Sequence, residues 1–181
     1  MYLWHSSTIS QYIEYIKDAF LVEEAMSYDV KGRKYIGTET KYYFTDIGIR
    51  GSILNFRQQE ESHIMENIIY TELRRRRYSV DVGRIEYRDV THDGKRDRKL
   101  LEVDFVVNNP PERYYIQSVL YIPSAEKENQ EHRPLLAIDD HFRKIIITAD
   151  NIHRKQDEKG ILTISLMDFL LDYQLGSEHI L

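Results

Sequence analysis

Two neighbouring stretches decide the fold of this chain: KLLEVDFVV at residues 99–107 and RYYIQSVLYI at residues 113–122. Both are short and rich in β-branched and aromatic residues, which is typical of strands. The turn-forming sequence NNPP lies between them at residues 108–111 and favours a tight connection. The two stretches are therefore predicted to be antiparallel neighbours in one sheet.

Alternate side chains of a strand share a face of the sheet, so the sequence predicts on which face each polar residue lies. It places Glu102 and Asp104 on one face of the first strand, and Gln117 and Val119 on one face of the second. Two acids on an otherwise apolar strand are costly to bury without partners. The pattern indicates either a metal site or ion pairs at a sheet edge. The opposite, apolar face of the first strand is predicted to carry Leu101, Val103, Phe105 and Val107.

The composition limits the class of protein. A chain of 181 residues with 41% hydrophobic residues is large enough for one domain, or for one domain and a small appendage. The net charge of -5 gives no global positive field, so contact with nucleic acid needs a local basic patch. Cysteine is absent, which excludes disulfides and thiolate metal sites and suits a reducing compartment. No signal peptide or membrane span is recognisable, so we expect a cytoplasmic protein without membrane contact.

The first 51 residues have the pattern of a partial winged helix. Helical spacing of apolar residues predicts a helix over residues 7–20, followed by extended segments at 21–30 and 41–44 around a basic turn. A helix followed by a ribbon with a basic tip is the latter half of a winged helix. The apolar side chains of this helix need cover from the second domain, from Leu3 and Trp4, or from a second copy of the chain, and we favour the last.

Residues 52–181 are predicted to form a mixed α/β domain. A helix over residues 60–78 has an apolar stripe bordered by Glu66, and a strand over 79–87 follows it. A charged hairpin loop at 89–99 leads into the two strands described first. The remaining elements are a loop leading into a helix at 124–139, strands at 143–149 and 161–164, and a helix at 166–173.

That order of elements, with Glu66 on the first helix, Asp104 on the second strand and Gln117 on the third, resembles the PD-(D/E)XK nuclease core. In that superfamily an acid on the second strand and an acid-x-lysine on the third surround divalent cations. The resemblance implies Mg²⁺ as a candidate cofactor of Glu66, Asp104 and Gln117, with Glu102 as a weaker ligand. We therefore expect Asp104 and Gln117 on one sheet face, with Glu66 reaching the same pocket. Val119 stands where the lysine belongs, which implies weak or absent catalysis.

Nine short stretches follow one another along the chain: YIEY (12–15), DAFL (18–21), YDVKGRKY (28–35), KYYFTD (41–46), MENI (65–68), EVDFV (102–106), YIQ (115–117), PLL (134–136) and DFLL (168–171). In this order they resemble the C-terminal region, a domain of unknown function, of a bacterial and archaeal AAA-type ATPase family. The resemblance implies an upstream ATPase domain as a partner, and we interpret the chain as a fragment or a truncated gene product. The chain has no Gly-x-x-x-x-Gly-Lys loop, so no ATP site of that kind is predicted in it.

Two basic clusters are the candidates for contact with DNA. The first closes the predicted helix over residues 60–78, where cations oppose the helix dipole. Such a run usually marks the solvated end of a helix, where the aliphatic parts of the side chains pack against the protein. Arginine runs also bind phosphate. The second forms the tip of the ribbon. The two clusters are Arg74, Arg75, Arg76 and Arg77, and Lys31, Arg33 and Lys34.

The leading functional prediction is a non-catalytic C-terminal accessory domain of an AAA-type ATPase, with a degenerate nuclease-like site and a role in nucleic-acid or protein recognition. One alternative is an active Mg²⁺-dependent DNA endonuclease that uses Glu66, Asp104 and Gln117, with an unconventional cation in place of the missing lysine. The other alternative is a structural module for homo-oligomerisation.

Overall fold

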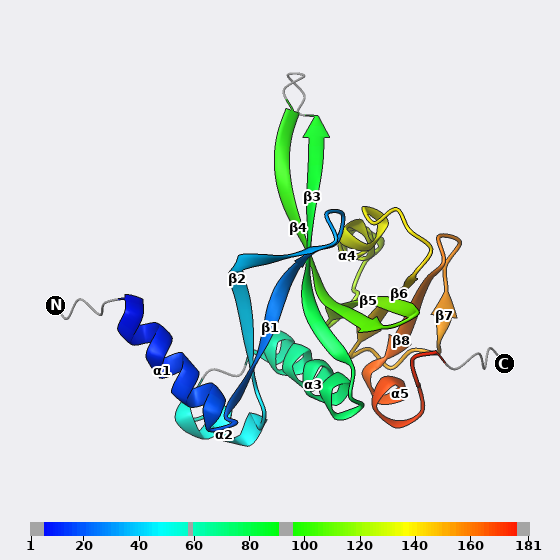
Figure 1. Ribbon diagram of the computed structural model, residues 1–181. Coiled ribbons are helices and arrows are strands. Elements are labelled where there is room, and N and C mark those ends of the chain that lie inside the picture. The colour runs from blue at the N-terminus through cyan, green and yellow to red at the C-terminus, as the bar shows by residue number, and fades with distance from the viewer. Residues whose placement is uncertain (1–5, 58–59, 91–95, 177–181) are drawn as a thin grey trace.

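The computed structural model describes residues 6–57, 60–90 and 96–176, and within these ranges one mixed sheet of eight strands organises the molecule (Figure 1). The predicted α/β class with flanking helices is confirmed. The strand order is β2-β1-β3-β4-β5-β6-β8-β7. The helices are α1 (Ser6–Asp18), α2 (Ile47–Ile53), α3 (Glu61–Arg75), α4 (Ala125–Leu136) and α5 (Leu166–Leu171). The strands are β1 (Val22–Asp29), β2 (Lys34–Phe44), β3 (Ser79–Val90), β4 (Arg96–Asn109), β5 (Glu112–Val119), β6 (Arg143–Thr148), β7 (Lys155–Gln156) and β8 (Ile161–Ser165).

The strand pairings join the N-terminal ribbon to the rest of the sheet. Strands β3, β4 and β5 are successive antiparallel neighbours, so the predicted pairing of the two opening stretches is confirmed. Strand β5 then pairs in parallel with β6, and β6 with β8. The ribbon of β1 and β2 enters the sheet through a short parallel pairing of β1 with β3. The segment before residue 52 therefore shares its sheet with the segment after it.

Two hydrophobic cores lie on opposite faces of the sheet. The first contains Ile69 and Leu73 of α3 and Phe169 of α5, whereas the second contains Leu135 of α4. Strand β6 contributes to both, because Ile145 and Ile147 point into the first core and Ile146 into the second. A continuous apolar run is expected for a strand that is covered on both faces.

A β-bulge in β4 changes the predicted distribution of its side chains. Gly83 of β3 pairs with Val103, but Asp81, two residues earlier, pairs with Val106, so β4 has one extra residue here. As a result, Phe105 packs in the first core, whereas Val103 packs in the second. The predicted single apolar face is therefore wrong: Val107 lies with Phe105, and Leu101 packs against the core of Val103.

Several element boundaries differ from the prediction. Residues 46–51, predicted as a join, instead include the cap and most of α2, whose first turn is capped by the Asp46 side chain accepting from the amide of Ile49. Part of the segment 89–99, predicted as a charged loop, is strand, since β3 runs to Val90 and β4 begins at Arg96, and the two strands form a long arm (Figure 1). The predicted cover by Leu3 and Trp4 lies outside the described residues. None of the helices in the described ranges has the length and apolar character that crossing a membrane requires.

Candidate functional site

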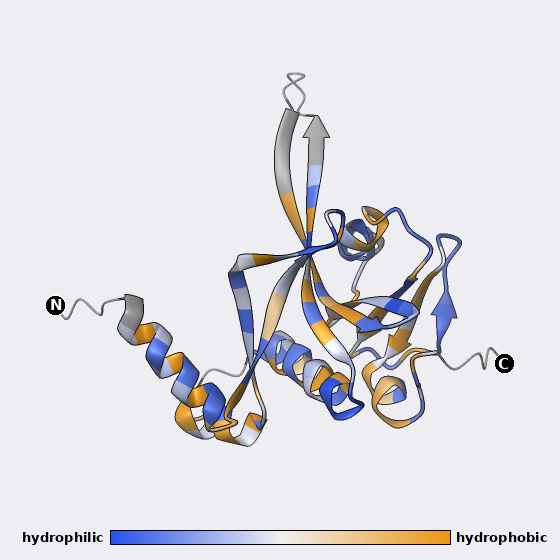
Figure 2. Cartoon of the chain, in the orientation of Figure 1, coloured by the Kyte–Doolittle hydropathy of each residue, from blue (hydrophilic) through white to orange (hydrophobic). Residues whose placement is uncertain are grey.

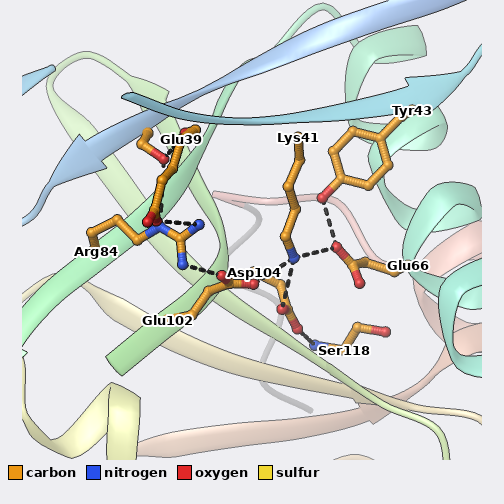
Figure 3. A network of polar contacts seen from close by, with 9 residues as sticks. Glu39, Lys41, Tyr43, Glu66, Arg84, Glu102, Asp104 and Ser118 are labelled. Atoms are coloured by element: carbon orange, nitrogen blue, oxygen red, sulfur yellow. Dashed lines mark hydrogen bonds and ion pairs between the residues drawn. The ribbon is translucent and has the colours of Figure 1, made fainter. Parts of the chain in front are cut away.

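The ammonium group of Lys41 lies among three carboxylates that come from two other elements (Figure 3). Its Nζ is 2.8 Å from Oε1 of Glu66 on α3 and 3.9 Å from Oδ1 of Asp104 on β4. It also forms an ion pair with Glu102 of β4. Glu66, Glu102 and Asp104, three acids named as candidates from the sequence, are thus gathered around one lysine of β2.

The charges continue outward from this lysine as an alternating network. Arg84 of β3 forms an ion pair with Glu102, and its Nη2 is 3.1 Å from Oε2 of Glu39 on β2 (Figure 3). On the other side, the hydroxyl of Tyr43 donates a 2.7 Å hydrogen bond to Glu66. Four carboxylates therefore share two cations within this network.

An irregularity in β2 brings Lys41 to the acids. Ser27 of β1 pairs with Ile36, but Ala25 pairs with Lys41, so two steps along β1 correspond to five along β2. The extra residues of β2 lie between Ile36 and Lys41 and lengthen this strand relative to β1. Without them, a regular ladder would place Thr38 opposite Ala25.

Contacts between β2 and α3 fix the end of the ribbon beside the acids. The Tyr43 ring stacks on Tyr70 of α3, with ring centroids 4.1 Å apart and an interplanar angle of 16°. The Asn67 side chain accepts from the amide of Phe44 at 2.9 Å and donates to the carbonyl of the same residue at 2.7 Å. Asn67 therefore satisfies both main-chain groups of Phe44, which holds β2 against the helix that carries Glu66.

Asp104 is the most buried of the three acids and lies where β4 and β5 separate. The paired register of these strands ends at Phe105 and Ile116, and beyond it the amide of Ser118 donates a 2.8 Å hydrogen bond to Asp104. Burial and the nearby charge of Glu66 raise the pKa of Asp104 to about 7, although Lys41 and the Ser118 amide oppose the change. Asp104 therefore holds a proton over part of the neutral range.

Lys41 and Tyr43 keep their protons. Burial alone would lower the pKa of Lys41, but the charges and hydrogen bonds of Glu66 and Glu102 outweigh burial and raise it. Burial and the charge of Glu66 both raise the pKa of Tyr43, so its hydroxyl remains a donor to Glu66. The network therefore consists of a protonated Lys41 and a neutral Tyr43 that contact carboxylates.

Gln117 does not join this network, and the prediction that Asp104 and Gln117 share a face is wrong. Tyr115 and Val119, the neighbours of Gln117 two positions away along β5, pack in the second core on the α4 side. Gln117 pairs with Ile146, which also belongs to that core. Asp104 instead contacts elements on the α3 side of the sheet. The bulge in β4 interrupts the alternation of side chains between the two faces, and this places Asp104 on that side. The Oε1 atom of Gln117 is buried and has no hydrogen-bond partner.

These residues do not fit the metal site that the nuclease resemblance implies. A divalent cation needs carboxylate oxygens that are free to coordinate it, and here the ammonium of Lys41 lies between them. Within the described ranges, no group of three or more His, Asp or Glu side chains has an arrangement that could hold a metal ion. Val119, where the lysine was expected, is buried in the second core.

The arginine run is largely engaged in intramolecular contacts. Arg74 forms a 2.7 Å ion pair with Glu23, and both Arg75 and Arg76 bond the buried carboxylate of Glu72. Hydrogen bonding to Arg75 is the largest contribution to the lowered pKa of Glu72. Three of the four arginines are therefore partnered by acids, and Arg77 is exposed at the end of the run. The other basic cluster, Lys31, Arg33 and Lys34, is exposed at the tip of the ribbon.

Sequence reasoning did not identify Lys41, Tyr43 or Arg84. One signal was present, because Glu39, Lys41 and Tyr43 alternate along a strand and so share a face, with an acid, a cation and a phenol in succession. The sequence did not reveal which residues contact this face, because these contacts depend on the pairing of β1 with β3 and on the irregularity in β2.

Comparison with known proteins gives two matches. Residues 4–60 match the model of a family described as a domain of unknown function, DUF8612. The chain is also 33% identical, over 164 residues, to a protein of Haemophilus influenzae named only as uncharacterized. That alignment covers 91% of this chain and 37% of the relative, so the chain spans little more than a third of the length of this relative. No solved structure matches this chain.

Proposed function

We propose that this chain is a non-catalytic accessory domain of an AAA-type ATPase, which recognises nucleic acid and retains a degenerate nuclease-like site. One observation carries the proposal: the ammonium of Lys41 lies 2.8 Å from Glu66 and forms an ion pair with Glu102, beside the buried Asp104. An internal cation replaces the external one that a nuclease of this kind would require.

The order of the elements supports the nuclease-like ancestry. Helix α3, strands β3, β4 and β5, helix α4 and strand β6 follow in the helix, three-strand, helix, strand order of that core. Glu66 on the helix and Asp104 on the second strand lie in one network, as the resemblance implies. We interpret the helix α1 and the β1–β2 ribbon as the latter half of a winged helix. Gln117 on the other face is the departure, and it favours the non-catalytic proposal.

Physical reasons argue against catalysis at this site. Metal-assisted hydrolysis needs a cation with an open coordination position, which activates a water molecule. Lys41 has no such position, and its four-carbon stem comes from a ribbon that is fixed to α3 by Asn67. Replacing it with a metal ion would break its ion pairs with Glu66 and Glu102 and leave a half-buried ammonium group without them.

The tip of the ribbon is the surface best suited to nucleic acid. Lys31, Arg33 and Lys34 are exposed there, and Nζ of Lys31 donates a 3.3 Å hydrogen bond to the carbonyl of Glu86 on β3. The tip therefore lies against β3 at the base of the arm that β3 and β4 form. Phosphate contacts of this kind give affinity without sequence preference. The link to an ATPase rests on the sequence resemblance.

DNA binding tests the recognition half of the proposal. Fluorescence anisotropy with a short duplex at low salt should show binding that weakens as salt rises. Replacing Lys31, Arg33 and Lys34 together with Ala should weaken binding and lower the salt slope by roughly one for each phosphate that is no longer neutralised. Arg75→Ala is the matched control, since this exposed arginine is paired within its own helix. Equal losses of affinity in both variants, or no binding at low salt, would refute the assignment.

DNA cleavage tests the non-catalytic half. Supercoiled DNA incubated with the chain and Mg²⁺ or Mn²⁺ should remain intact. Robust cleavage that is lost in Asp104→Ala would instead favour the alternative, an active metal-dependent endonuclease.

A further inference from the structure

The largest concentration of exposed apolar side chains lies on α1 and α2, away from the acid network. Helix α1 extends from the body of the molecule, and apolar residues are frequent along both helices (Figures 1 and 2). Eight of the sixteen large hydrophobic side chains that are exposed in the described residues belong to this region, although it is a small part of the chain. They are Ile9, Tyr12, Tyr15, Ile16, Phe20, Ile49, Ile53 and Phe56, and together they are called the α1–α2 surface.

The end of α1 and the start of α2 are bonded to each other. The amide of Thr45, just before α2, donates to the carbonyl of Leu21, just after α1, and the Thr45 hydroxyl donates to the carbonyl of Phe20 at 2.7 Å. On α1, Ile9, Tyr12 and Ile16 recur at helical spacing and form one stripe. No residue of α2 is buried. Apolar patches of this kind usually mark a surface that binds another protein.

We propose that the α1–α2 surface binds the same surface of a second copy of this chain, with the two α1 helices antiparallel about a twofold axis. The area is sufficient for such a dimer. Eight half-exposed side chains of this size offer on the order of 800 Å² on each copy, which is about what a standard stable interface buries per partner.

The charges on α1 select the antiparallel arrangement. Residues 6–13 include no ionisable side chain except the phenol of Tyr12, whereas the second half of the helix contains Glu14, Lys17 and Asp18. Lys17 is bound by Glu14 and by Glu24 of β1, so this end of α1 has excess negative charge. An antiparallel pair places that end against the uncharged N-terminal half of the partner helix, where the helix dipole is positive. A parallel pair would place Glu14 and Asp18 beside their own copies.

In a closed twofold dimer, the same surface of each copy forms the interface. An apolar stripe that packs against its own copy meets this requirement. The eight apolar side chains of this surface offer no cation to phosphate, which favours a protein over duplex DNA as the occupant. The proposal is independent of the nuclease-like site and of the basic ribbon tip.

Sedimentation velocity of the whole chain tests the dimer. The wild-type chain should be a dimer at high micromolar concentration, and Ile16→Glu should be a monomer with an unchanged circular dichroism spectrum. If Ile16→Glu unfolds, Ile53→Glu on α2 provides the same test. Met167→Glu on α5 is the control, because this side chain is 60% exposed but lies outside the surface. A wild-type monomer at that concentration, or equal loss of the dimer in the control, would overturn the proposal.

Cross-linking tests the orientation, and the absence of natural cysteine makes the result unambiguous. Under mild oxidation, a mixture of Ile9→Cys and Ile16→Cys chains should form the mixed disulfide faster than either chain links to itself. Faster linkage of each chain to itself would show a parallel pair and overturn the antiparallel arrangement.

Discussion

Lys41 and Glu66 are separated by 25 residues, yet a 2.8 Å ion pair joins the N-terminal ribbon to helix α3. The pair links two segments that sequence reasoning assigned to separate domains. It also determines the chemistry of the site, because Glu102 and Asp104 share the same cation. The ribbon is therefore part of the site as well as of the sheet.

Removing the Lys41 charge should destabilise the chain. Lys41→Met leaves Glu66, Glu102 and Asp104 without their common cation, and we expect a decrease of about 1–3 kcal/mol in the free energy of unfolding. Urea denaturation at neutral pH measures it. Lys34→Met, an exposed lysine on the same strand, is the control and should change little. If Glu66→Gln is added, the double variant should be less destabilised than the sum of the single variants, and strict additivity would contradict the coupling.

Asp104 should make stability fall as pH rises. Its pKa is about 7 in the native state, against 3.8 for the unperturbed group, so between these values the native state binds more protons than the unfolded chain. Its contribution to stability is therefore present at low pH and is lost as pH rises from about 4 to about 7. Between pH 5 and 8, wild type should lose stability relative to Asp104→Asn. A constant difference between the two, or a change in the other direction, would contradict this.

Arg76 should matter far more than its neighbour Arg75. The Arg76 side chain bonds the buried Glu72, donates to the carbonyls of Phe169 and Tyr173 near the end of α5, and lies 4.7 Å over the Phe169 ring. Arg76→Ala should lower the unfolding free energy by about 2–4 kcal/mol. Arg75→Ala removes an exposed arginine from the same carboxylate and should have little effect. Similar decreases in the melting temperatures of the two variants would contradict the assignment.

Gly83 should resist substitution because it lies beside the bulge in β4. A Cβ at this position would be 2.9 Å from Cγ2 of Val106 and 3.0 Å from Cβ of Val103, both in the second core. Gly83→Ala should therefore cost about 1–3 kcal/mol. Gly37→Ala is the control, because a Cβ there would meet no atom within 4 Å. Equal melting temperatures of the two variants would show that the bulge is not closely packed.

The sequence predicted the features that depend on local signals. The pairing of β4 with β5 follows from two β-rich stretches around residues 108–111, and the buried strand β6 follows from its run of three isoleucines. Helix α2 was missed because two glycines weaken its helical pattern, although Asp46 was present as a capping residue.

The site was only partly predictable, since it depends on contacts between distant segments. Glu66 and Asp104, grouped from the resemblance, both contact Lys41, although β3 lies between α3 and β4 in the chain. Gln117 was misplaced because a single extra residue in β4 changes which face Asp104 occupies. Lys41 reaches the acids through the irregularity in β2 and the pairing of β1 with β3, neither of which leaves a signature in the local sequence.

If Lys41 serves as the resident cation of the three acids, the site should not take up a divalent metal ion. Electron paramagnetic resonance of Mn²⁺ at pH 7.5 measures this, because the signal of free Mn²⁺ decreases when the ion binds. We predict that the wild-type chain leaves the free signal unchanged at millimolar Mn²⁺. Stoichiometric binding of Mn²⁺ by the wild-type chain, abolished in Asp104→Asn, would contradict the assignment of Lys41.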